Sequence, residues 1–81
     1  VTDYQRIVEN NLHQKNYALA SDYLKQMKAL YSDNELYYLC RLDYLASLGR
    51  GEDIKQLRKE VETKQIYLSS ATKGVLAFWE S

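Results

Sequence analysis

Apolar residues recur every three or four positions along most of the chain, a spacing that places side chains on one face of an α-helix. In the segment from about Asp3 to Gln14, the recurring positions are Tyr4, Ile7, Val8, Asn11 and Leu12. From about Tyr17 to Tyr31, they are Ala20, Tyr23, Leu24, Met27 and Leu30. Strict apolar–polar alternation never persists long enough for a strand, and there is no proline. The pattern therefore predicts an all-α fold.

Polar and glycine-containing breaks divide the rest of the chain into further helices. Ser32 and Glu35 have the spacing of a capping box, in which each side chain binds a free amide at the start of a helix. A third helix is expected from this box to about Leu48, where "GRG" at 49–51 ends it because glycine adopts a positive φ without steric cost. The remaining helices are expected at about 52–64 and 66–80. The short links make consecutive helices antiparallel neighbours.

The two halves of the chain resemble each other when one is shifted by the distance in sequence from Tyr4 to Tyr38, here called the repeat interval. The shift also places Val8 on Leu42, Ala20 on Ile54, Tyr23 on Leu57 and Met27 on Val61. The same period, about 34 residues, is that of the tetratricopeptide repeat (TPR). Residues 4–34, "YQRIVENNLHQKNYALASDYLKQMKALYSDN", resemble one repeat of that family through Tyr4, Ile7, Tyr17, Ala20, Tyr23 and Leu24. The resemblance implies a short TPR-like α-solenoid of antiparallel hairpins with about five helices, although another small helical bundle would show the same helical spacing.

A single TPR-like domain over residues 1–81 is the expected organisation. It comprises one repeat at about 1–34, a second at about 35–68 and a closing helix at about 66–81. The first unit departs from the family pattern at Lys15, which replaces the usual turn glycine, and at Met27, which replaces a small alanine. The second unit has a turn, "SLGRGEDI", that fits the family better. At this length the chain is one small domain or a piece of a larger protein.

Charge and cysteine content exclude several classes of partner. Eleven Lys and Arg residues balance eleven Asp and Glu residues, so no net field attracts nucleic acid or an anionic membrane surface. No apolar run reaches the roughly 18 residues that a membrane span needs. The single cysteine, Cys40, has no internal disulfide partner, which favours a reducing, cytoplasmic setting.

Residues that could carry catalysis are few. His13 lies at the polar end of the first helix, where only Glu9 is spaced to contact it, so an ordinary surface histidine is expected. Cys40 lies in the apolar segment "YYLCRL", which favours an inert buried thiol. No phosphate-binding loop or metal-ligand spacing is present. We therefore expect no enzyme, no catalytic residue, no metal site and no cofactor within these residues.

The resemblance implies a protein–protein interaction module whose first helices line a concave groove for a peptide or helix of a partner protein. The family's groove positions fall here on Thr2, Gln5, Glu9, Leu12, His13, Leu36, Leu39, Asp43, Ala46 and Ser47. Relatives that clamp a carboxyl terminus use lysine and asparagine where this chain has Gln5 and Glu9, which argues against that kind of ligand. The segment "ELYYLCRLDYLASLGRGEDI" is also distantly similar to small bacterial secretion chaperones, so a chaperone or adaptor is one form of this function.

A different class of function remains open from the sequence. The chain is alternatively a structural or dimerising helical appendage of a larger bacterial enzyme, such as a glycosyltransferase, or of a regulator. Phe78 and Trp79 stand side by side near the end of the last helix, where both cannot face inward. One of them is therefore expected to contact another chain or a missing neighbouring unit. Contact with a second copy of the chain would make the protein a homo-oligomer through its C-terminal helix.

Overall fold

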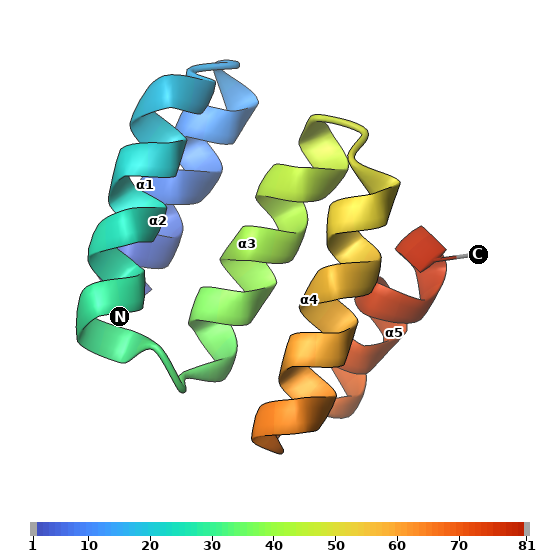
Figure 1. Ribbon diagram of the computed structural model, residues 1–81. Coiled ribbons are helices and arrows are strands. Elements are labelled where there is room, and N and C mark those ends of the chain that lie inside the picture. The colour runs from blue at the N-terminus through green and yellow to red at the C-terminus, as the bar shows by residue number, and fades with distance from the viewer. Residues whose placement is uncertain (1, 81) are drawn as a thin grey trace.

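The computed structural model describes residues 2–80, and its secondary structure is entirely helical there (Figure 1). Five helices follow in order, α1 at Thr2–His13, α2 at Tyr17–Tyr31, α3 at Glu35–Ser47, α4 at Gly51–Lys64 and α5 at Ser70–Glu80. Helix accounts for 82% of this part of the chain, and no strand occurs in it. The predicted all-α class is confirmed.

Helix α3 occupies the middle of the molecule. Figure 1 shows α1 paired with α2 on one side of it, and α4 paired with α5 on the other. Helix α3 contacts all four other helices, whereas in the described part of the chain neither α1 nor α2 has backbone contacts with α4 or α5. Each of the other four helices is therefore buried by α3 and by the helix beside it, α1 with α2 and α4 with α5.

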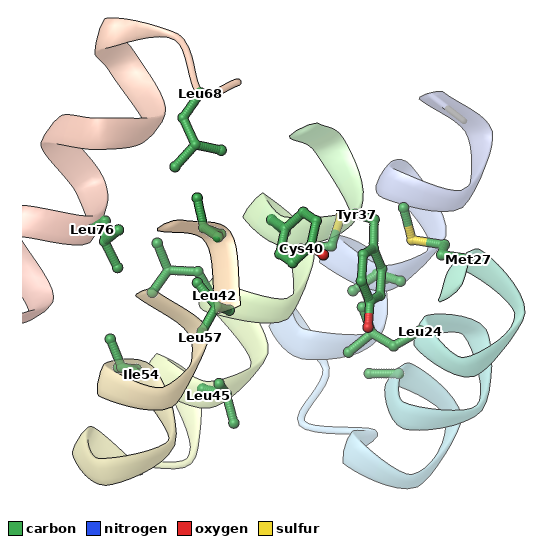
Figure 2. Packing of buried hydrophobic residues seen from close by; sticks show 14 residues of the cluster. Leu24, Met27, Tyr37, Cys40, Leu42, Leu45, Ile54, Leu57, Leu68 and Leu76 are labelled. Atoms are coloured by element: carbon green, nitrogen blue, oxygen red, sulfur yellow. The ribbon is translucent and has the colours of Figure 1, made fainter. Parts of the chain in front are cut away.

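The core is a chain of apolar contacts that runs from α2 through α3 to α5. Leu24, Met27 and Tyr37 gather where α2 meets α3, and Leu42 and Leu57 face each other between α3 and α4 (Figure 2). At the far end the cluster is completed by Leu68 and Leu76, and Thr72 is a buried polar residue of α5. The apolar spacing predicted most of this core, because positions three and four apart share one helix face. One predicted core position was wrong, because Leu30 is exposed, and Tyr37 is a buried residue that the spacing did not predict.

The start of α3 differs from the prediction. Asn34, rather than Ser32, caps the helix, and its side-chain oxygen accepts a hydrogen bond from the Leu36 amide at 2.8 Å. The capping box is therefore wrong. The Glu35 carboxylate instead accepts a hydrogen bond from the backbone amide of Ser69, and this bond lowers the pKa of Glu35. One carboxylate thus ties the start of α3 to the start of α5.

The closing helix begins later than expected, at Ser70 rather than at about Ile66. The segment 66–69 is not helical, because Gln65 ends α4 in the left-handed conformation at φ 56° and turns the chain. The side chain of Leu68 is buried from this segment, so its apolar character belongs to the connection rather than to a helix face.

The turns of the two hairpins have the same backbone hydrogen bonds at positions one repeat interval apart. In the first, the amides of Lys15 and Asn16 donate to the carbonyls of Leu12 and Asn11; in the second, the amides of Gly49 and Arg50 donate to those of Ala46 and Leu45. The residue at the centre has a positive φ in both, 61° at Lys15 and 69° at Gly49. The departure of Lys15 from the glycine pattern is therefore a substitution at a position whose backbone suits glycine.

Candidate functional site

A groove of about 360 Å³ lies between α1 and α3 and reaches the end of α5. Its lining consists of Glu9, Leu12, His13, Asp43, Ala46, Ser47 and Trp79. Leu12, Asp43 and Ala46 are half-buried, whereas the other lining side chains are exposed. The groove therefore has a partly buried floor with apolar and charged members, and a polar rim.

The two walls of the groove come from equivalent positions of the two hairpins. Glu9 and Asp43, Leu12 and Ala46, and His13 and Ser47 are each separated by one repeat interval. On each helix these positions are spaced by three and four residues, which places them on one face. Val8 on α1 and Leu42 on α3, each four residues before a groove residue, are fully buried. Core and groove thus lie on adjoining faces of the same two helices, and Leu12 and Ala46 pack against the core.

Six of the ten groove positions predicted from sequence line this groove. They are Glu9, Leu12, His13, Asp43, Ala46 and Ser47. The other four, Thr2, Gln5, Leu36 and Leu39, lie on the same helices but outside the lining. Gln5 acts on the groove indirectly, because its side-chain amide donates a hydrogen bond to the Glu9 carboxylate at 3.4 Å. Leu36 and Leu39 are half-buried and extend the same side of α3 toward its start.

Trp79 is a groove residue that the sequence did not assign. Its indole is 46% exposed and packs edge-to-face on Phe78, with ring centroids 5.2 Å apart. The expectation that these neighbouring rings cannot both face inward holds, since Phe78 is 69% exposed and does not line the groove. The repeat interval gave no signal for the groove, because Trp79 stands that far beyond Leu45, a buried inward position of α3.

The charges in the groove are unbalanced. Asp43 and Glu9 are close enough to influence each other, and the pKa of Asp43 is raised to about 6 first by burial and then by the Glu9 charge. Neither carboxylate has an ion-pair partner among residues 2–80, whereas Glu60, Asp53, Glu52 and Glu62 all do. The groove is therefore an electronegative site with one half-buried carboxylate.

The chain offers little for catalysis near this groove. Cys40 is completely buried, and burial, followed by the charges of Asp43 and Glu9, raises the pKa of its thiol to about 12. The thiol therefore remains protonated at neutral pH, as expected for an inert buried cysteine. His13 is exposed and has no hydrogen bond or ion pair with Glu9. Over residues 2–80 no group of three metal-binding side chains comes together.

A second, larger hollow of about 550 Å³ lies against α4, α5 and the connection between them. It is lined by Arg58, Val61, Glu62, Gln65, Ile66, Tyr67, Leu68, Lys73, Leu76 and Ala77. No helix of the described residues packs beyond this surface, and the exposed aromatic rings of Tyr67 and Phe78 belong to the same end of the molecule. This hollow therefore lies at the end of the molecule that α4 and α5 form.

No family model, curated protein or solved structure matches this chain. None of the described helices has the length and apolar character needed to cross a membrane. Function is therefore inferred from the groove and from the internal similarity of the two hairpins.

Proposed function

We propose that this chain is a TPR-like interaction module that holds a peptide or helix of another protein in the groove between α1 and α3. The observation that carries the proposal is the groove itself, which presents side chains from equivalent positions of two hairpins and is bounded by Trp79. Exposed indole, half-buried apolar side chains and a polar rim are typical of surfaces that bind protein segments. In this function the chain serves as an adaptor or as a small chaperone.

The helical arrangement supports a repeat stack as the frame of this groove. Val8, Leu42 and Leu76 follow one another at the repeat interval, one on each of α1, α3 and α5, and they are 0%, 1% and 7% exposed. The turns repeat at the same interval. Contacts only between neighbouring helices are what a solenoid requires. A TPR-like stack of this kind would place α1, α3 and α5 along one binding surface.

Site-specific photocrosslinking tests the proposed function. The crosslinking residue p-benzoylphenylalanine replaces Ser47 in the groove in one variant, and Gln56 on the exposed side of α4 in the control. Expressed in the native host, the first variant should crosslink to a partner protein and the second should not. The assignment should then be checked with Trp79→Ala, which removes the indole at the groove edge and should abolish the Ser47 crosslink. Equal crosslinking from both positions would contradict binding in this groove.

A second candidate function is favoured by the end of the molecule that α4 and α5 form. Tyr67 exposes a large aromatic side chain in the lining of the 550 Å³ hollow at α4 and α5, and Phe78 exposes another on α5. Paired across a two-fold axis, these ends would bury each other and make the chain a dimerising appendage. Sedimentation velocity should then show a dimer that Phe78→Ser dissociates, while the control Leu30→Ser, at an exposed leucine of α2, leaves it intact. A monomer at all accessible concentrations would exclude this function.

A further inference from the structure

The sign of the charge in the groove narrows the chemistry of its occupant. Two carboxylates, from Glu9 and Asp43, line the groove, and no lysine or arginine does. The imidazole of His13 is the one basic group of the lining. Four acidic side chains outside the groove have ion-pair partners within residues 2–80, as in the pairs Arg41–Glu60 at 2.6 Å and Arg58–Glu62 at 3.2 Å. The groove is thus a place where negative charge is left without a cation from this chain.

The position of Asp43 makes this imbalance costly for the free protein. Its carboxylate is half-buried, and both burial and the neighbouring Glu9 raise its pKa. A charge held in such a place loses hydration and gains no ion pair in return. A cation supplied from outside would stabilise the ionised form of Asp43, and the free energy would appear as binding.

The other lining residues suit the side chain that carries such a cation. Lysine and arginine consist of a long aliphatic stem with a charged end. Leu12 and Ala46 offer apolar contact for the stem, and the indole of Trp79, which lines the same groove, belongs to the side chain that binds cations best. An anionic segment would meet two like charges in the same space, which disfavours acidic peptides and nucleic acid.

We propose that the groove selects a partner segment carrying a lysine or arginine, whose charged end binds Glu9 and Asp43 while its stem packs on Leu12, Ala46 and Trp79. This inference rests on the proposed function and specifies the chemistry of the partner. It predicts binding that weakens with added salt, because the attraction is between opposite charges.

Selection from a random peptide library tests this chemistry directly. Displayed short peptides should be selected on the immobilised protein and counter-selected on the Trp79→Ala variant, so that groove binders are retained. The retained peptides should be enriched in lysine or arginine at one position relative to the starting library. Replacement of that residue, arginine by citrulline or lysine by acetyl-lysine, removes the charge with little change of shape and should weaken binding about tenfold or more.

The matching change in the protein is Glu9→Gln combined with Asp43→Asn, which removes both groove charges and keeps the shapes. This variant should lose about tenfold or more in affinity for the selected peptide. The control is Asp22→Asn combined with Glu52→Gln, which removes the same charge from exposed positions of α2 and α4 and should bind within about twofold of the parent protein. Circular dichroism should show both variants folded.

The outcomes of these experiments separate the two proposals. Groove binders without enrichment of basic residues, or with equal affinity for the charge-neutral groove variant, would overturn the cation inference and leave peptide binding standing. Failure to recover any peptide that depends on Trp79, together with equal crosslinking from Ser47 and Gln56, would overturn both. Enrichment of lysine or arginine with loss of binding on either neutralisation supports the inference.

Discussion

The turn at residues 14–16 in the first hairpin and the turn at 48–50 in the second have the same hydrogen bonds but different residues at the left-handed position. Gly49 adopts a positive φ at no steric cost, whereas Lys15 has a Cβ that the same conformation crowds. The shared backbone shows that packing of the helices decides the geometry of the turn. The residue at its centre determines only how much that geometry costs.

The same comparison extends to the buried positions of α2 and α4. Ala20 and Met27 on α2 correspond to Ile54 and Val61 on α4, and all four are buried. One hairpin thus places a small and a large side chain where the other places two of intermediate size. Cores tolerate such redistribution when the total volume and the pattern are kept.

Residues at equivalent positions of the repeat interval also differ in where their helices lie in the molecule. Helix α3 contacts four other helices, whereas α5 contacts only α3 and α4. The equivalent leucines Leu42 and Leu76 are both buried, but the second lies beside the open hollow at the end of the molecule. The comparison therefore predicts unequal effects for equal substitutions.

The largest expected effect is that of Leu42→Ala. Because the surrounding helices hold the cavity open on several sides, the free energy of unfolding should fall by about 3–5 kcal/mol. Leu76→Ala removes the same atoms beside a hollow that can relax, and should cost about 2–3 kcal/mol. Urea denaturation followed by circular dichroism measures both. A greater loss at Leu76 would show that α5, rather than α3, is the centre of the core.

Asp43→Asn should have the next largest effect on the free energy of unfolding, and this effect should depend on pH. The pKa of Asp43 is raised from 3.8 to about 6 in the folded protein, so the folded state binds the proton more tightly than the unfolded state. Stability from this group is present below about pH 4 and is lost as the pH rises through about 6. Partial solvation limits the loss to about 1–2 kcal/mol. Asp43→Asn should therefore be more stable than the parent protein at about pH 7.5, and the gain should vanish near about pH 4.

The stabilities of Asp43→Asn and of the parent protein must be compared at each pH. Other carboxylates have pKa shifts opposite in direction to that of Asp43. The pKa of Glu35 is lowered by the Ser69 amide; burial raises that of Glu60, but the ion pair with Arg41 outweighs it and the net shift is downward. Their stabilisation is lost on acidification in both proteins and cancels in the difference. In a Glu9→Gln background the gain from Asp43→Asn should be smaller, since Glu9 contributes to the shift. A gain independent of pH would refute this account of Asp43.

Helix positions and most of the core could be predicted from the sequence because burial follows the period of the α-helix. The boundaries around α3 and α5 could not, since Glu35 and Leu68 are used in contacts between distant segments. A carboxylate spaced for a capping box and one that bonds the Ser69 amide have the same local sequence. The capping box was therefore a reasonable local prediction that a tertiary contact overrode.

In the candidate site, the sequence predicted only the residues of α1 and α3 that are related by the repeat interval. Glu9 and Asp43, which are equivalent by the repeat interval, could be placed on one face from sequence alone. Trp79 could not, because its reach into the groove depends on where α5 begins and how it packs on α3. The half-burial of Asp43 likewise arises from α3 being the central helix, which no local pattern specifies.

Substitutions at the left-handed position of each turn should have smaller effects on stability. They test the difference between Lys15 and Gly49 at the centres of the two turns. A Cβ added at Gly49 would meet no atom within 4 Å, so Gly49→Ala introduces backbone strain without a clash. The free energy of unfolding should fall by about 1 kcal/mol. Gly51→Ala, in the first turn of α4 and equally free of contacts, is the control and should not destabilise the protein. If both substitutions behave alike, the positive φ at residue 49 does not explain the glycine there.

The smallest expected effect is a gain from Lys15→Gly. Glycine relieves the strain of a positive φ at this position, but it also gives the unfolded chain more freedom, so the two terms partly cancel. The net increase in the free energy of unfolding should be about 0.5 kcal/mol. Lys15→Ala is the matched control, because it removes the same charge and keeps the Cβ, and it should give no gain. If alanine stabilises as much as glycine, the benefit comes from losing the lysine side chain, and the two turns would differ in charge rather than in backbone strain.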